Sequence, residues 1–145
     1  LRRALETQAA IMAASRIEPD EVARLEALVD RMEENVANLD GWVAADCEFH
    51  QSVAHYSGNS LIAFLIVALG DTIRDVISAL HTQTKVRDNK ATILRHREIV
   101  HALAAHDPER ASRAIAEHFS AAAPAVAAVM AVAAKSSERS VLSAS

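Results

Sequence analysis

Residues 96–118 read HREIVHALAAHDPERASRAIAEH, and this stretch indicates two helices joined by a tight turn. Asp107 is a good helix N-cap and Pro108 suits the first helical position, so one helix ends shortly before this pair and another begins with it. His96 lies eleven residues before Asp107, and His118 lies eleven residues after it. At about 1.5 Å per residue, an antiparallel hairpin would place both histidines at the same height, roughly 16 Å from the turn.

The composition of the whole 145-residue chain also favours helices. Half of the residues are hydrophobic, but only 3% are aromatic, and alanine dominates the apolar set. Alanine, leucine, glutamate and arginine are strong helix formers, whereas sheets favour β-branched and aromatic residues. We therefore predict an all-α fold, an antiparallel bundle of about six helices. The expected helices cover residues 1–15, 19–36, 40–56 and 60–81, a range from about 89 to 106, and residues from 107 onward.

Several details of these helices can be predicted. Leu1, Leu5, Ala9 and Met12 form the expected buried face of the first helix, and Asp40 is the candidate N-cap of the third. The fourth helix is apolar nearly all round at first, as in a central helix or a subunit interface. Pro124 is a candidate kink in the last helix. The helical domain should cover residues 1–134, and residues 135–145 should form a frayed, disordered tail.

Bulk properties exclude several classes of function. The net charge of −4 argues against nucleic-acid binding by this segment alone, because phosphate neutralisation needs surplus Lys and Arg. The single cysteine cannot form an internal disulfide, which favours a reducing cytoplasm. The longest apolar run, residues 61–69, is half of a membrane span, and the charged opening is unlike a signal peptide. Because the chain begins with leucine, we expect a further segment upstream.

Four polar side chains are predicted to point into the bundle. On the third helix, Asp46 lies one turn after Trp42 and one turn before His50, on or beside the apolar face. His96 and His118 each lie on the apolar stripe of their own helix. A buried aspartate is costly unless it is paired or bound to a cation. The set therefore predicts a site for one divalent transition metal (Zn, Ni, Mn or Fe), or a buried network of hydrogen bonds among the same residues.

Other polar residues are weaker candidates. The spacing of Glu98 and His101 imitates half of a di-iron motif, but it occurs once and faces outward. Cys47 has no neighbouring CxxC motif, so an inert core thiol is expected. Arg74, on the flank of the fourth helix, could reach an anion in a pocket, although such an arginine more often extends to solvent.

The motif Asp46-x-x-Phe49-His50, followed by Ser57-Gly58-Asn59, resembles the FCD domain, the effector-binding half of FadR-subfamily GntR transcription regulators. The opening residues 1–6 (LRRALE) also resemble this domain, as do residues 96–103 and 107–111 and the later His118. The resemblance covers about residues 1–120.

This resemblance implies a metal held by Asp46, His50, His96 and His118, the four residues also indicated by the helical faces. It further implies that the metal holds a small organic acid, for which Arg2 and Arg74 are candidate contacts. Binding of the acid would alter the DNA binding of a preceding winged helix-turn-helix domain, which is absent from this chain. The regulator would bind DNA as a homodimer. No membrane is implied. Metal and effector affinity should fall below about pH 6, because only neutral histidines bind metals.

Two alternatives share the same residues. A hydrolase-like metalloenzyme would use the ion to activate water. It needs a general base, and the inward faces show no spare glutamate or histidine, so we expect a sensor and not an enzyme. A purely structural dimerisation module would keep the buried His/Asp network without a metal. The sequence does not identify the effector, the metal, the dimer contact face or the direction of regulation.

Overall fold

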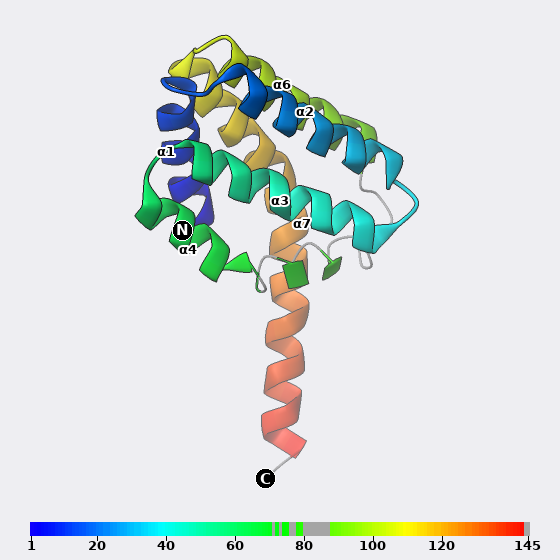
Figure 1. Cartoon of the computed structure of the whole chain (residues 1–145). Coiled ribbons are helices and arrows are strands. Elements are labelled where there is room, and N and C mark those ends of the chain that lie inside the picture. The colour runs from blue at the N-terminus through cyan, green and yellow to red at the C-terminus, as the bar shows by residue number, and fades with distance from the viewer. Residues whose placement is uncertain (71, 73, 76–77, 80–87, 144–145) are drawn as a thin grey trace.

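A computed structural model describes residues 1–70, 72, 74–75, 78–79 and 88–143, and every element in those ranges is helical. The helices are α1 (Arg2–Ala14), α2 (Pro19–Glu34), α3 (Leu39–Tyr56), α4 (Ser60–Ala68), α6 (Asn89–Ala104) and α7 (Pro108–Ser143). Figure 1 shows α1, α2, α3, α6 and the first part of α7 packed into a bundle, with α4 along one side. The predicted all-α bundle is confirmed. None of the described helices is long and apolar enough to cross a membrane.

Local capping residues explain where most helices begin. The Asp107 carboxylate accepts a hydrogen bond from the Arg110 N–H at 2.9 Å, and Pro108 is the first residue of α7, as predicted. The predicted cap of α3 is wrong by two residues. Asn38, and not Asp40, precedes the helix and accepts from the Gly41 N–H at 3.3 Å. Asparagine is as good an N-cap as aspartate, so residue type alone could not choose between them.

The turn between α3 and α4 needs a glycine. Gly58 has a φ of +70°, in the left-handed region that side chains with a Cβ disfavour. Asn59 then caps α4 by accepting hydrogen bonds from the N–H groups of Leu61 and Ile62. This turn reverses the chain between α3 and α4, as the Ser-Gly-Asn-Ser sequence predicts.

Two helices end elsewhere than predicted. Helix α4 ends at Ala68 with Leu69 as its C-cap, but the described residues that follow up to residue 79, Gly70 included, are again helical, so the expected helix is interrupted at Leu69. The rest of the expected helix, to residue 81, includes residues outside the described ranges. Helix α7 extends to Ser143, past Lys135, where a frayed tail was expected. Pro124 lies inside α7, and the far part of the helix projects away from the bundle (Figure 1).

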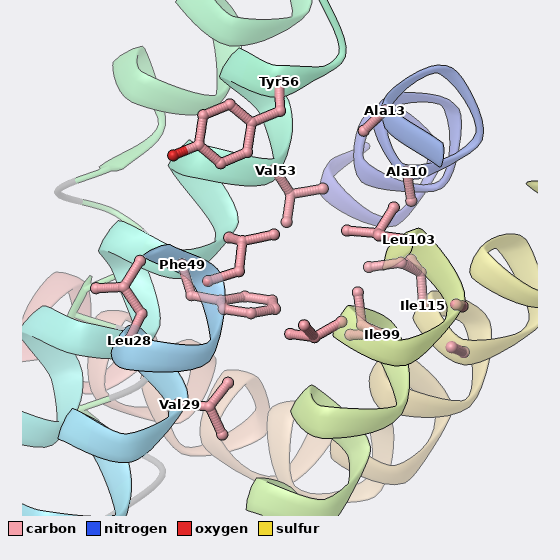
Figure 2. Close-up of a cluster of buried hydrophobic side chains, with 14 of the residues drawn as sticks. Ala10, Ala13, Leu28, Val29, Phe49, Val53, Tyr56, Ile99, Leu103 and Ile115 are labelled. Atoms are coloured by element: carbon pink, nitrogen blue, oxygen red, sulfur yellow. The ribbon is translucent and has the colours of Figure 1, made fainter. Parts of the chain in front are cut away.

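The hydrophobic core lies between α1, α2, α3, α6 and the start of α7 (Figure 2). Phe49 and Val53 of α3 face Ile99 and Leu103 of α6, and Ile115 of α7 lies beside them. A smaller cluster joins α1 and α3 to α4, and it consists of Ala9, Ala54, Ile62 and Ile66. The core thus closes around the middle of α3, the helix that carries two of the predicted site residues.

The predicted buried face of α1 is only partly right, because Ala9 is completely buried but the larger residues around it are not. Leu1 is 86% exposed, and Leu5 and Met12 are only partly buried. The face that packs into the bundle instead consists of Glu6, Ala9, Ala10, Ala13 and Ala14. These residues have the i, i+3, i+4, i+7, i+8 spacing of a buried helical stripe. Large side chains suggested the wrong face, because small alanines carry little hydrophobic signal although they allow close helix packing.

Candidate metal centre

The four predicted site residues lie together in the interior. Asp46 and His50 come from α3, His96 from α6 and His118 from α7. Their exposed fractions are 3%, 2%, 0% and 8%, respectively. The equal distances of His96 and His118 from the Asp107 turn bring both histidines to the same level of the bundle, as the spacing predicts. Residues far apart in the sequence thus form one buried polar cluster.

The three histidine rings are close neighbours. Ring centroids lie 4.5 Å apart for His96 and His118, 5.0 Å for His50 and His118, and 5.4 Å for His50 and His96. One nitrogen from each ring lies within 4.8 Å of the others. Phe49 contacts the rings of His50 and His96 edge-on, and Phe119 contacts His118 in the same way. The two phenylalanine rings thus pack against all three imidazoles.

Hydrogen bonding assigns the proton of His96. Its Nδ1 lies 2.9 Å from the Thr92 backbone oxygen, which can only accept, so Nδ1 carries the hydrogen. In neutral His96, Nε2 then presents a lone pair, and it lies 3.2 Å from Asp46 Oδ1. Two acceptors facing each other in a buried site repel, unless a proton or a cation lies between them. Helix α6 thus presents Nε2 in the form that a metal ligand needs.

Each of the four residues has at least one buried side-chain atom for which the structure shows no hydrogen bond; His50 has two, because its Nδ1, which makes an ion-pair contact with Glu6, is the second. The other four atoms are Asp46 Oδ1, His50 Nε2, His96 Nε2 and His118 Nδ1. Buried polar atoms ordinarily have partners, so four together need an explanation. Ligand atoms around a metal at bond lengths of about 2.0–2.2 Å lie roughly 3–3.5 Å apart, which the 3.2 Å contact of Asp46 and His96 matches. Three imidazoles and one carboxylate therefore fit a divalent transition metal.

The electrostatics of the site favour an ionised aspartate and a neutral histidine. Burial alone would raise the pKa of Asp46, but the hydrogen bond that forms when His96 Nε2 carries a proton, together with the nearby His50, holds this pKa well below its usual range. Burial lowers the pKa of His118 well below its ordinary value, and the neighbouring His96 and His50 lower the pKa further. Both shifts maintain the protonation states in which these groups bind metals.

Glu6 of α1 is the buried polar residue that the sequence reasoning missed. The expectation of no spare inward glutamate is therefore wrong. The side chain of Glu6 is 2% exposed; one carboxylate oxygen contacts His50 Nδ1, and the other accepts a hydrogen bond from Arg2 Nε at 2.5 Å. Burial tends to raise the pKa of Glu6, but His50 and Arg2 together lower this pKa. Both oxygens are engaged, so Glu6 is not a free general base.

The two candidate effector contacts differ in their surroundings. The Arg2 guanidinium lies over the Phe119 ring, 5.2 Å from its centroid, and its Nη2 is buried without a hydrogen bond that the structure shows. Arg2 is thus near the histidine cluster through both Glu6 and Phe119. Arg74 is exposed, although its charge is close enough to lower the pKa of the Cys47 thiol against the effect of burial, which raises it.

The remaining histidines that the structure describes lie outside the cluster. His55 and His101 are exposed, and His106 uses Nδ1 to contact the Ala14 oxygen at 2.9 Å. His81 lies outside the described residues. Cys47 is buried and free, as predicted, and its thiol pKa is raised first by burial and then by Asp46. Glu98 pairs with Arg110 at 2.7 Å at the surface, so the Glu98/His101 motif does not enter the core.

The described helices form an all-α domain that encloses one buried cluster of histidines. The sequence model of the FCD domain matches residues 1–121, so the chain belongs to the FCD domain family. It is an effector-sensing regulatory domain of the kind found in GntR-family transcription regulators, and it is not an enzyme.

Curated relatives include two bacterial regulators. The HTH-type transcriptional repressor NanR of Cronobacter sakazakii is 27% identical over 82% of the chain and 46% of its own length. An uncharacterized HTH-type transcriptional regulator of Bacillus subtilis, YcbG, is 32% identical over 81% of the chain and 48% of its own length. The chain thus spans about half the length of these relatives.

Solved structures agree with the fold. Streptococcus agalactiae GntR superposes with a TM-score of 0.69 at 31% identity, over 81% of this chain and 52% of that chain. E. coli McbR/YncC superposes with a TM-score of 0.75 at 19% identity, over 86% of this chain and 60% of that chain. The second likeness shows the shared helical fold alone.

Proposed function

We propose that this domain senses a small organic acid through one divalent transition metal held by Asp46, His50, His96 and His118. The observation that carries the proposal is the set of four buried donor atoms, one from each residue, without hydrogen bonds among the described residues. The bound metal would supply positive charge for an incoming carboxylate. Zn, Ni, Mn and Fe all suit this ligand set.

Arg2 supports the acid as the chemical class of effector. Its buried Nη2 donor lies beside Phe119, which contacts His118. A carboxylate that enters next to the histidines would offer this donor an acceptor, in a pair that is stronger than a neutral hydrogen bond. Arg74, which is exposed, is the weaker of the two candidates.

Effector binding would connect helices that the sequence keeps apart. Asp46 and His50 belong to α3, His96 and His118 to the α6–α7 hairpin, and Arg2 to α1. A ligand shifts a domain between two arrangements only by its differential affinity for them, commonly about 1–3 kcal/mol of coupling. In the full-length cytoplasmic regulator, we propose that this coupling reaches a preceding winged helix-turn-helix domain of a homodimer and alters its grip on DNA.

Metal stoichiometry tests the proposal. Inductively coupled plasma mass spectrometry on tag-free protein should find about one equivalent of metal per chain, and His118→Ala should lose it. The control is His101→Ala, which removes an exposed histidine of α6 and should keep the metal. No metal in the parent after incubation with Zn²⁺, Ni²⁺ and Mn²⁺ would instead support a hydrogen-bonded structural core built on the Asp46–His96 contact.

A further inference from the structure

Glu6 occupies an unusual place for a glutamate. It lies on the buried face of α1, among alanines that are completely inaccessible to solvent. Burying a carboxylate is unfavourable unless its oxygens have partners. Glu6 has two partners, Arg2 on its own helix and His50 on α3. The resemblance includes Glu6 only as part of the opening residues 1–6 and gives it no role, so its contact with His50 comes from the structure.

The contact with His50 determines which ring nitrogen is free. A carboxylate accepts hydrogen bonds, so the proton of a neutral His50 resides on Nδ1, the atom that contacts Glu6. The structure shows no hydrogen bond for either ring nitrogen of His50, but Nδ1 makes the ion-pair contact with Glu6, whereas Nε2 has no ion-pair contact among the described residues. It belongs to the ring that lies 5.0 Å from His118 and 5.4 Å from His96. Glu6 thus stands on the outer side of His50, and the other histidines stand on the inner side.

We infer that Glu6 is a positioning residue: its carboxylate holds His50 in the Nδ1–H tautomer and turns Nε2 toward His96 and His118. This inference rests on the proposed metal site. Thr92 does the same for His96 with its backbone oxygen, which accepts from Nδ1 at 2.9 Å. A backbone oxygen is fixed by the helix, whereas the Glu6 side chain needs its own support. Arg2 gives that support by donating to the second oxygen at 2.5 Å.

The contacts of Asp46 and Glu6 give the two carboxylates different roles. Asp46 faces His96 Nε2, on the inner side of the cluster, and offers an oxygen atom to a metal. Glu6 faces His50 Nδ1, on the outer side, and both of its oxygens are engaged by protein groups. Outer partners of this kind orient the metal-binding ring and increase its basicity. Their removal typically reduces metal affinity by about 10- to 100-fold.

The test combines zinc affinity with the tautomer of His50. Zinc affinity is measured on the 145-residue chain by competition with a chromophoric chelator, for the parent, Glu6→Leu and Glu6→Gln. We expect Glu6→Leu to weaken zinc binding by about 10- to 100-fold. Glu6→Gln should lie between the parent and Glu6→Leu, because one amide oxygen can accept from His50 or from Arg2 but not from both with the original geometry. The control is Glu98→Gln, which breaks the surface pair with Arg110 and should bind zinc as the parent does.

Long-range ¹H–¹⁵N correlation spectra of the metal-free parent show which nitrogen of His50 carries the proton, with His50→Gln for assignment. The expected result is Nδ1–H in the parent and a mixture of tautomers in folded Glu6→Gln. A parent His50 protonated at Nε2 would overturn the inference, as would equal zinc affinities of the parent and both Glu6 variants. Absence of zinc binding by the parent would contradict the proposed metal site instead. If Glu6→Leu fails to fold, the zinc affinity of Glu6→Gln and the His50 tautomer of the parent still test the role of Glu6.

Discussion

Helices α3 and α4 are neighbours in the chain, and each departs from the rule that polar residues face water and apolar residues do not. Helix α3 buries Asp46 and His50. Helix α4 leaves Leu61, Phe64 and Val67 exposed at 64%, 67% and 58%. Both departures cost free energy in an isolated chain. Contacts inside the domain compensate for the buried polar residues of α3. No described residue covers the three exposed apolar side chains of α4.

The difference indicates what each helix is for. The buried polar atoms of α3, α6 and α7 lie close together, so a ligand that binds them must be small. Three exposed apolar side chains on successive turns of one helix are typical of an interaction site, where the apolar surface of another molecule would bury them. A subunit interface is one of the two expectations for this helix, and the second copy of a homodimer would supply such a surface.

The largest contrast should come from two phenylalanines. Phe49 of α3 is fully buried against the histidine rings, and Phe64 of α4 is 67% exposed. Phe49→Ala should lower the free energy of unfolding by about 3–5 kcal/mol, because it leaves a cavity in the core. Phe64→Ala, measured in urea at a protein concentration that favours monomers, should change it by less than about 0.5 kcal/mol. Equal losses would remove the contrast between the two helices.

Metal removal should affect the interior next. A ligand at 100 times its dissociation constant stabilises the folded state by about 2.7 kcal/mol, so EDTA should lower the thermal midpoint of the zinc-loaded parent. His96→Ala should show no such shift, because it removes a proposed ligand from α6. The exposed His101 provides the control, since His101→Ala should respond to EDTA as the parent does. A shift retained in His96→Ala would place the metal elsewhere.

The exposed face of α4 should govern self-association. We expect the parent to have the mass of two chains in size-exclusion chromatography with multi-angle light scattering. Phe64→Glu should raise the dissociation constant by about 30-fold, since a central interface side chain is worth about 2 kcal/mol. Leu94→Glu is the matched control, because Leu94 is 58% exposed on α6, away from α4. A dimer that survives Phe64→Glu but not Leu94→Glu would move the interface to α6.

The smallest effect should be the pH dependence of the metal-free domain. The lowered pKa of His118 keeps it neutral in the folded state, whereas the unfolded chain gains this proton near pH 6.5. Stability rises with pH wherever the unfolded state binds more protons, so lowering the pH from 7 to 5 should decrease the stability. His118→Gln should flatten the slope in thermal melts. The charged and titratable groups that act on His118 are His96, His50, Asp46 and Arg2.

Sequence patterns predicted the buried cluster of one aspartate and three histidines better than they predicted the buried face of α1. The spacing about Asp107 and the i, i+4 pair on α3 are geometric consequences of regular helices, so Asp46, His50, His96 and His118 could be placed together before any coordinates. Glu6 could not, because its stripe is made of alanines and the larger Leu5 and Met12 indicated another face. A test for small residues at i, i+3 and i+4 from a glutamate would have found it.

Helix ends were harder to predict for a different reason. Asn38 and Asp40 are both good caps, and only the tertiary position of the chain selects one of them. The interruption at Leu69, after which the described residues up to residue 79 are helical again, has no local sequence signal among the apolar residues that precede it. Neither error moved a site residue, because the site depends on the middles of helices.

The alanine face of α1 has a mechanical consequence. Ala9, Ala10, Ala13 and Ala14 have no side-chain rotamers, so the contact that they make with the bundle cannot adjust by repacking. A displacement of Arg2 or Glu6 would therefore move the whole of α1, because no rotamer change along its alanine face can compensate for it. Because its alanine face is made of methyl groups, we expect α1 to move as one rigid body when its first turn, beside the histidine cluster, is displaced.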